Sequence, residues 1–260
     1  MPSAPRERFA LSDVHGHLTD FSTTLRSHGL TDPGGSWAAG ASHLWILGDY
    51  LDRGDDGQPV VDAVRTLQAE AAHAGGAVHA LLGNHELQFL AALHFGHREV
   101  SGDGRTSFLA NWRRYGGRDE ELAAVTEDQV EWMTALPLLG VAADDLLLHS
   151  DTRGYLELGS TVDEINAAGR SILTGRNSKE WADLHRIMVR RGELVRPDAR
   201  AELLQSSNAQ RIVHGHSTLR GGFGLSGPDA DRPFSYGDGA VLAIDGGVFE
   251  DGGRLLLARL

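Results

Sequence analysis

Short polar segments that follow apolar runs are the part of this chain whose residue types could do chemistry. They are Ser12-Asp13-Val14-His15-Gly16, Gly48-Asp49-Tyr50-Leu51-Asp52-Arg53-Gly54, Gly83-Asn84-His85-Glu86, His149 and His214-Gly215-His216. These segments supply carboxylate, imidazole and amide groups without any thiolate, a ligand set that suits Mn²⁺, Fe or Zn²⁺. Two such ions about 3.5–4 Å apart can clamp a phosphoryl group and acidify a bridging water to hydroxide near neutral pH. The segments therefore predict a two-metal site that cleaves phosphate esters.

The spacing of these polar residues suggests how they would share the metal-binding work. Asp13 and His15 are one residue apart, so in an extended segment both side chains point to the same side. Asp49 supplies a carboxylate that can bridge two ions. A neutral oxygen and two imidazoles complete the predicted ligand set: Asn84, His149 and His216.

Three residues close to these ligands could handle the proton and the phosphate. The leaving alkoxide needs a proton, and His85, next to a ligand but itself free, is the candidate general acid. Asp52 could hold the imidazole of His85 and raise its pKa. Arg53 could grip the non-bridging phosphate oxygens, together with the amide of Asn84.

A second phosphate clamp would have to be an arginine, because Lys179 is the only lysine among 24 basic residues. Arg153 and Arg176 are the two candidates, and for each the alternative is an ordinary solvated surface arginine. The neighbouring Arg190-Arg191 are expected on an exposed helix face.

The predicted site residues need elements that bring them to one place. Each polar segment follows a short apolar run that is typical of a buried strand: Phe9 to Leu11, Leu44 to Leu47, Ala77 to Leu82, Leu146 to Leu148, and Ile212-Val213. In α/β folds ligands gather beyond the carboxyl ends of strands, so these segments are expected to converge.

Helical patterns separate the expected strands. Helices are predicted over Thr19 to His28 and Gly57 to Ala74, and helical spacing recurs over Asn111 to Leu136 with a break at Gly116-Gly117. A further helical stretch over Thr161 to Leu204 is divided by Gly192 and Pro197. The segment Ala240 to Leu260 alternates like a hairpin that turns at Asp251-Gly252-Gly253. We therefore expect one α/β domain over residues 1–260, with a mixed sheet or two stacked mixed sheets and helices outside.

Composition excludes several classes of protein. The chain has 260 residues, 41% of them hydrophobic, which is ordinary for a globular protein, and no cysteine that could serve as a nucleophile. A net charge of -12 disfavours a dedicated nucleic-acid binder. No run of about 20 apolar residues would span a membrane, and the first residues lack the apolar core of a secretory signal. A cytoplasmic enzyme is the expectation.

The five polar segments, in this order, resemble the motifs of calcineurin-like metallophosphoesterases. The resemblance is to the branch of serine/threonine protein phosphatases and their small bacterial and phage relatives. It covers roughly residues 8–90, 130–150 and 208–260, and leaves a helical insert at about 95–135 and the helices at about 161–204 unplaced. The resemblance implies a four-layer sandwich of two mixed sheets flanked by helices. It also assigns one metal to Asp13, His15 and Asp49, and a second to Asp49, Asn84, His149 and His216, with manganese expected and iron or zinc as alternatives.

Two departures from the family pattern, and the alignment of its last motif, bear on the site. Leu82 stands before Gly83, where relatives often have arginine, and Ser150-Asp151 follows His149 in place of small residues. The carboxylate of Asp151 could change the affinity of the second metal or repel an anionic substrate. In the last motif, alignment on Gly215 favours His216 as the ligand, with His214 as its neighbour.

These features predict a dinuclear metal-dependent phosphomonoesterase, in particular a bacterial-type serine/threonine protein phosphatase that uses a metal-bound hydroxide and His85. Its substrate would be a phosphorylated protein or a small phosphorylated molecule, with no membrane or nucleic-acid partner. The alternative is a hydrolase of nucleotide phosphoanhydrides such as diadenosine tetraphosphate, for which Trp112, Tyr115 or Trp181 would form an aromatic shelf. A catalytically silent scaffold is a third reading, although this chain keeps every ligand and the acid. The sequence does not specify the oligomeric state.

Overall fold

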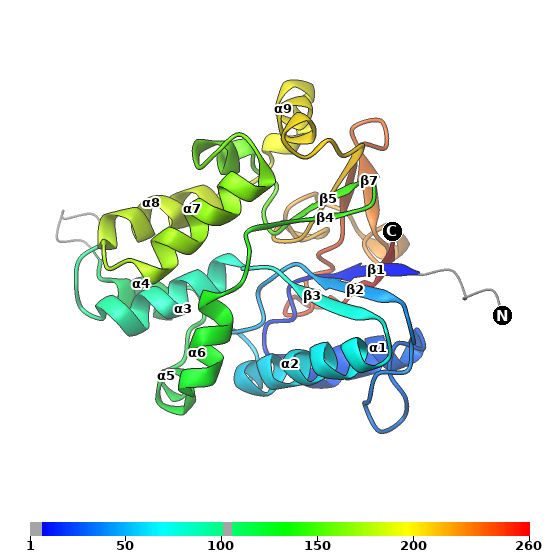
Figure 1. Cartoon of the computed structure of the whole chain (residues 1–260), viewed down its shortest axis with the longest axis horizontal. Coiled ribbons are helices and arrows are strands. Elements are labelled where there is room, and N and C mark those ends of the chain that lie inside the picture. The colour runs from blue at the N-terminus through cyan, green and yellow to red at the C-terminus, as the bar shows by residue number, and fades with distance from the viewer. Residues whose placement is uncertain (1–6, 101–105) are drawn as a thin grey trace.

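Two β-sheets lie face to face at the centre of the computed structural model, which describes residues 7–100 and 106–260 (Figure 1). In the first sheet β1, β2 and β3 are parallel and β9 runs antiparallel to β1, in the order β3-β2-β1-β9. The bounds of its strands are Arg8–Leu11 (β1), His43–Ile46 (β2), Ala77–Ala80 (β3) and Ala258–Arg259 (β9).

The second sheet is also mixed. It has the order β4-β5-β6-β8-β7, in which β5, β6 and β8 are parallel and the edge strands β4 and β7 are antiparallel to their neighbours. Its strands are Leu139–Ala142 (β4), Asp145–Leu148 (β5), Arg211–His214 (β6), Phe234–Tyr236 (β7) and Val241–Ala243 (β8).

Alternation of side chains along the strands builds the layers. Trp45 of β2 faces the second sheet and packs in a cluster with Leu147 of β5 and Val213 of β6. Its neighbours Leu44 and Ile46 point the other way, into the larger core that includes the apolar faces of the outer helices. The inner faces of the two sheets therefore share one thin apolar layer. The outer faces pack in a further apolar layer with the helices, which gives the predicted sandwich.

Two helices cover the outer face of the first sheet (Figure 1). They are α1 (Leu18–Ser27) and α2 (Gly57–His73). On the side of the second sheet, α9 (Pro197–Ser207) packs near β6. The other helices lie together beside the sandwich, toward the carboxyl ends of the parallel strands: α3 (Asn84–Phe95), α4 (Phe108–Arg114), α5 (Asp119–Ala124), α6 (Glu127–Thr134), α7 (Val162–Thr174) and α8 (Ser178–Met188). Short 3₁₀ helices span Arg153–Glu157, Glu193–Val195 and Gly227–Asp229.

Most of the predicted elements are confirmed, and the predicted α/β class is confirmed with them. Asn111 to Leu136 is not one helix but parts of three, α4 to α6, and the chain does turn at Gly116-Gly117. The helix α3 was not predicted. Every residue from Asn84 to Ala92 is buried, so this helix has no polar face and no amphipathic period that would reveal it.

The predicted C-terminal hairpin is wrong. β8 pairs with β6 on one side and β7 on the other, so neither of its edges is free for β9. The chain instead crosses from the second sheet to the first, where β9 joins β1. The crossing segment 244–257 carries Gly246 and Gly247 past the ends of the strands.

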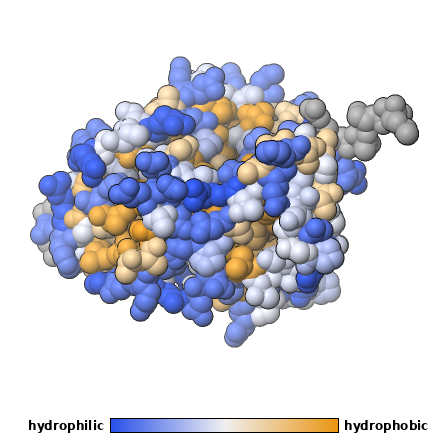
Figure 2. All heavy atoms as spheres, turned by 60° about the horizontal axis from the view of Figure 1, so that its bottom comes forward, coloured by the Kyte–Doolittle hydropathy of each residue, from blue (hydrophilic) through white to orange (hydrophobic). Residues whose placement is uncertain are grey.

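Within the described ranges no helix is long and apolar enough to cross a bilayer. On the face that Figure 2 shows, hydrophobic side chains form separate patches among hydrophilic ones.

Candidate metal centre

All six predicted metal ligands meet where the strands of both sheets end. Backbone hydrogen bonds join the loops: Asp13 N–H donates to Gly48 O at 3.1 Å, and His15 N–H to Asp49 O at 2.9 Å. From the second sheet, Gly215 N–H donates to His149 O at 3.0 Å. The six side chains are almost fully buried, with exposed fractions between 0% and 3%: Asp13, His15, Asp49, Asn84, His149 and His216.

The backbone at this meeting point is strained. Among the described residues, nine that are not glycine have a positive φ, and six of them are at the site: Asp13, His15, Asp49, Asp52, Arg53 and His216. Such conformations cost about 1–3 kcal/mol each and persist only where the surroundings enforce them. Two glycines allow the close packing, because a Cβ on Gly83 would overlap the Asp49 carboxylate and one on Gly215 would overlap Ser12. The fold thus stabilises a local arrangement that the loops would not adopt alone.

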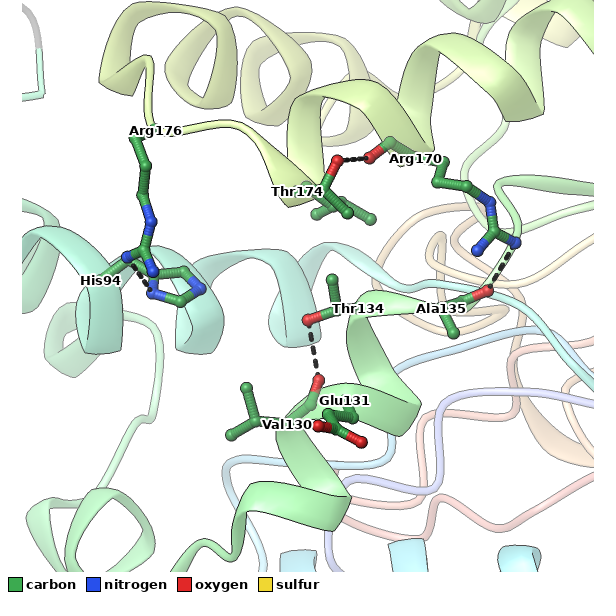
Figure 3. A pocket seen from close by; sticks show the side chains of 9 residues that line it. His94, Val130, Glu131, Thr134, Ala135, Arg170, Thr174 and Arg176 are labelled. Atoms are coloured by element: carbon green, nitrogen blue, oxygen red, sulfur yellow. Dashed lines mark hydrogen bonds between the residues drawn. The ribbon is translucent and has the colours of Figure 1, made fainter.

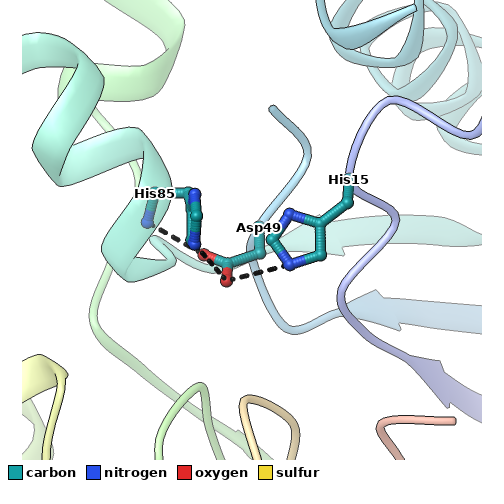
Figure 4. A group of neighbouring side chains, drawn as sticks. All are labelled: His15, Asp49 and His85. Atoms are coloured by element: carbon teal, nitrogen blue, oxygen red, sulfur yellow. Dashed lines mark hydrogen bonds and ion pairs between the residues drawn. The ribbon is translucent and has the colours of Figure 1, made fainter. Parts of the chain in front are cut away.

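Asp49 lies between two groups of possible ligands. On one side its Oδ2 is 3.5 Å from His15 Nε2, and Asp13 Oδ1 is 3.9 Å from the same nitrogen. His85 Nε2 lies 3.9 Å from Asp49 Oδ2, so His15, Asp49 and His85 surround one point (Figure 4). Two members of this group, His15 and Asp49, belong to the ligand set predicted for the first metal, whereas the third is the predicted acid His85 and not Asp13.

The second group lies on the other oxygen of Asp49. His149 Nε2 is 3.4 Å from Asp49 Oδ1 and 2.9 Å from Asn84 Oδ1. The ligand atoms of Asp49, His149 and His216 lie within 4.8 Å of one another. One carboxylate can therefore serve both positions.

The imidazole orientations fit a divalent cation at each position. His15 Nδ1 donates to Leu51 O at 3.0 Å and His149 Nδ1 to Leu47 O at 2.9 Å, which leaves each Nε2 to act as a ligand. His216 Nε2 is buried and has no hydrogen-bond partner among the described residues. A buried nitrogen without a partner is costly, and a bound cation would satisfy it. The residues present thus suit a metal centre of oxygen and imidazole ligands.

His214 differs from His216 in that both of its ring nitrogens have partners. Its Nδ1 lies 2.8 Å from Gly215 O, and its Nε2 lies 2.9 Å from the hydroxyl of Tyr236. This geometry favours the assignment of His216 as the ligand and of His214 as a structural neighbour.

The buried charges shift one another's pKa values. Burial alone would raise the pKa of Asp49, but His149 and His85 hold it well below its ordinary value. Burial alone would lower the pKa of His149, whereas Asp49 raises it to about 9. Since a histidine binds metal only when neutral, cations must compete with a proton at His149.

His85 and Asp52 form the predicted acid–base pair. His85 Nδ1 lies 2.6 Å from Asp52 Oδ2, and both side chains are buried. Burial alone would lower the pKa of His85, but Asp49 and the hydrogen bond that His85 donates to Asp52 raise it. The other nitrogen, Nε2, accepts a hydrogen bond from Arg53 at 3.2 Å, and the Arg53 guanidinium stacks 3.8 Å above the ring of Phe249. Arg53 is therefore held between His85 and Phe249, beside the predicted general acid.

Glu86 closes the third polar segment, but the sequence did not reveal its role at the site. Its buried carboxylate accepts backbone N–H bonds at 2.8–3.2 Å, from Asp49, Tyr50, Leu51 and Gly83. Burial and the nearby Asp49 raise the pKa of Glu86 to about 7. This side chain fixes the Asp49 loop to the start of α3, and its place three residues after Gly83 was the signal available in the sequence.

The structure does not bring Arg153 and Arg176 to the metal centre. Arg153 pairs with Glu202 at 2.6 Å. Arg176 contacts His94 at 3.2 Å, in a pocket of about 380 Å³ between α6 and α7 that Arg170 lines from the other side (Figure 3). His94 is nine residues beyond His85, about 13 Å along α3.

A different arginine, Arg191, lies at the centre. Its Nη1 donates to the backbone oxygen of His216 at 2.5 Å, and its charge helps burial to lower the pKa of His216. The loop that carries it is fixed by Asp151, whose carboxylate accepts from Gly192 N–H at 2.6 Å and from Ser217 Oγ at 2.7 Å. The carboxylate after His149 thus anchors the loop of Arg191, and its two oxygens are occupied by these bonds.

The proposed aromatic shelf is largely absent from the surface. Trp112 and Trp181 are 0% and 1% exposed, whereas Tyr115 is 46% exposed. Trp112 instead lies beneath the site, where its indole N–H donates to Asp52 Oδ1 at 2.8 Å.

Comparisons with known proteins agree with this geometry. The family model of the calcineurin-like phosphoesterases matches residues 9–218. A curated relative, Shewanella-like protein phosphatase 2 of Arabidopsis thaliana, is 26% identical over 136 residues, which are 52% of this chain and 34% of the plant protein. The match therefore spans about a third of that relative's length.

Solved structures show the same fold. The cold-active protein-tyrosine phosphatase of a psychrophilic Shewanella species is 25% identical, with a TM-score of 0.72 over 99% of this chain and 77% of that one. A serine/threonine phosphatase from Saccharomyces cerevisiae has a TM-score of 0.59 at 16% identity, over 99% of this chain and 80% of the yeast chain. The similarity extends over the helical insert as well as the sheets.

Proposed function

The chain belongs to the calcineurin-like phosphoesterase family, and from this premise we propose that it is a dinuclear metal-dependent phosphomonoesterase that acts on phosphorylated proteins. The observation that carries the proposal is the arrangement of buried ligand-type side chains around Asp49, beside the hydrogen-bonded pair of His85 and Asp52. Manganese as the metal and a cytoplasmic location are further parts of the proposal. They rest on the ligand types and on the composition of the sequence.

The proposed ligands divide into two sets that share Asp49. Asp13 and His15 would complete the first set, and the second would consist of Asp49 with Asn84, His149 and His216. When bound, two divalent cations would polarise the phosphoryl group and make a water nucleophilic near neutral pH.

The protein's own side chains would move the proton and hold the phosphate. As a water oxygen bonds to phosphorus and the bond to the leaving oxygen breaks, His85 Nε2 would give its proton to that oxygen. Asp52 would keep the imidazole oriented through Nδ1. Arg53 now donates to the same Nε2, so it would have to turn from His85 to the phosphate oxygens before the proton can be transferred.

Arg191 takes the place of Arg153 and Arg176 as the second phosphate contact in this proposal. Arg191 is an exposed residue whose Nη1 is anchored at the backbone of His216, so the other N–H groups of its guanidinium would be available to an oxyanion. The amide of Asn84 would be a third contact, from the side of the second metal position.

Two classes of phosphoprotein are candidates for the substrate. A buried acid such as His85 matters most when the leaving group is an alkoxide, which favours phosphoserine and phosphothreonine. The similarity to the Shewanella enzyme, described as a protein-tyrosine phosphatase, favours phosphotyrosine. The nucleotide alternative has less support, because only Tyr115 of the three proposed shelf residues is exposed.

The test is phosphate release by metal-stripped protein, with and without added Mn²⁺. The substrates are a phosphothreonine peptide, the matching phosphotyrosine peptide and diadenosine tetraphosphate. We expect Mn²⁺-dependent turnover of a peptide, and the preferred peptide identifies the substrate class. Turnover of the dinucleotide alone would replace the proposal with the nucleotide hydrolase. No turnover of any substrate by protein that binds the metal would favour the silent scaffold.

A further inference from the structure

The carboxylate of Asp52 accepts hydrogen bonds from two side chains, His85 and Trp112. The Asp52 side chain is completely buried, with Oδ2 2.6 Å from His85 Nδ1 and Oδ1 2.8 Å from the indole nitrogen of Trp112. Both oxygens of the carboxylate therefore have a hydrogen-bond donor. Trp112 lies on α4 in the helical insert, 60 residues after Asp52 and outside the polar motifs.

The indole itself has little freedom to move. Trp112 is completely buried, and its ring packs edge-on against Phe89 of α3 at 5.7 Å between centroids. The chain then folds back over the indole: Gly117 N–H donates to Trp112 O at 3.1 Å, and a Cβ on Gly117 would overlap the ring. Since α3 also carries His85 at its start, the indole is fixed relative to the imidazole.

The insert also holds the backbone beside the pair. Glu121 Oε1, on α5, accepts the backbone N–H of Asp52 at 3.3 Å. Gly116 O accepts the backbone N–H of Arg53 at 3.2 Å. Asp52 and Arg53 both have a positive φ, so these bonds stabilise a conformation that the loop would otherwise leave.

We propose that Trp112 is a positioning residue for the proton transfer, which it assists by holding Asp52 in the orientation that binds His85 Nδ1. Without the indole N–H, Asp52 Oδ1 would lose this donor, and the buried carboxylate would turn toward another partner, such as the nearby side chain of Glu121. His85 would then lose the hydrogen bond that keeps its Nε2 aimed at the leaving oxygen. The inference rests on the proposed function, because it needs His85 to act as the acid.

The test compares leaving groups in Trp112→Phe, which keeps an aromatic ring and removes the N–H. A phosphothreonine peptide leaves as an alkoxide and needs the acid, whereas p-nitrophenyl phosphate leaves as a stabilised phenolate and needs it little. We expect kcat on the peptide to fall by about 10–100-fold, with a much smaller fall on p-nitrophenyl phosphate and with KM nearly unchanged for both. An equal fall on both substrates, or none on the peptide, would overturn the inference.

Trp181→Phe is the matched control. Trp181 is about as buried as Trp112, but its indole N–H donates to Gly175 O at 3.2 Å instead of to Asp52. Trp181→Phe should not change the ratio of the two activities, and a change as large as that of Trp112→Phe would contradict the inference.

The variant His85→Ala distinguishes a failure of the inference from a failure of the proposed function. If it lowers turnover of the peptide selectively and Trp112→Phe does not, the proposed function stands and the inference fails. If the wild-type protein hydrolyses neither substrate, both fail.

A second measurement tests the hydrogen bond between Trp112 and Asp52 without changing Trp112. The chain has five tryptophans, so ¹⁵N labelling gives five indole N–H signals. Replacing Asp52 with Asn weakens the acceptor of the Trp112 N–H and should move one of these signals strongly upfield. Five unmoved signals in folded Asp52→Asn would overturn the inference.

Discussion

The strand-end loops and the group of helices α3 to α8 meet at the metal centre, but they are built in opposite ways. The loops hold six residues with positive φ and are stabilised only by their neighbours. The helices are locally satisfied: Ser107, Thr126 and Thr161 each accept an N–H of their own first turn. The loops and the first turn of α3 carry the reactive groups, whereas the other helices contribute a few polar atoms from within apolar packing.

The two regions differ in how easily their functional residues can be recognised from the sequence. The residues that could bind metal or transfer a proton lie just after the strands, and the two sheets bring them together. Support comes from the helical side through single hydrogen bonds, such as that of Trp112 to Asp52, which no local pattern announces. Variants of the loops, and of the helical residues that contact His85 or Asp52, should therefore fail in catalysis or metal binding. Variants elsewhere in the helices should fail in stability.

The largest expected effect is at the proposed proton donor, His85, in the first turn of α3. His85→Ala should retain the metal and lower kcat on a phosphothreonine peptide by about 10²–10⁴-fold, because the alkoxide would leave without a proton. Steady-state kinetics together with metal analysis of the purified variant check this. Unchanged turnover would remove His85 from the mechanism.

Asp49→Asn should instead reduce metal binding itself. The amide offers one oxygen where the carboxylate offers two, so the affinity for Mn²⁺ should fall by about 10–100-fold. Calorimetric titration of metal-stripped protein measures this. Asp145→Asn is the control, since Asp145 is also buried but pairs with Arg211 away from the centre. Equal losses in the two variants would mean that unfolding, not ligand loss, is the cause.

On the helical side, a pH effect on stability is expected from His185 of α8. Burial lowers its pKa to about 4, and its Nε2 has no hydrogen-bond partner among the described residues. The unfolded chain takes up this proton near pH 6.5, so the stability that neutral His185 contributes is complete above pH 6.5 and is lost as the pH falls toward 4.

Between pH 7 and pH 5 the loss at this one residue should be about 2 kcal/mol. Urea unfolding at the two pH values, with wild type and His185→Gln, measures it. The variant should lose less stability on acidification than the wild type does. An equal acid sensitivity of the two proteins would show that His185 titrates normally.

The smallest expected effect is at Arg191, which reaches from the end of the helical group into the site. Arg191→Ala should lower kcat/KM by about tenfold, the value of one hydrogen bond to a charged phosphate oxygen. Its neighbour Arg190 pairs with Glu157 at 2.5 Å, so Arg190→Ala should leave kcat/KM unchanged. If the two variants behave alike, Arg191 does not contact the substrate.

The strands and their ligands were predictable because each polar segment ends an apolar run, and the carboxyl ends of parallel strands share an edge. The position of Arg191 was not predictable, because two adjacent arginines, Arg190-Arg191, resemble an ordinary exposed helix face. The helix α3 lacks a polar face, and the β8 to β9 segment alternates like a hairpin although its strands join different sheets. These features depend on contacts between distant segments, which a local pattern does not contain.

The most direct test of the account is a titration of metal-stripped protein with Mn²⁺ while phosphate release from the preferred phosphopeptide is followed. Because Asp49 lies between two ligand groups, we predict that turnover is absent without metal and reaches its maximum only when two ions are bound per chain. Full turnover without metal, or a maximum at one ion per chain, would contradict the account.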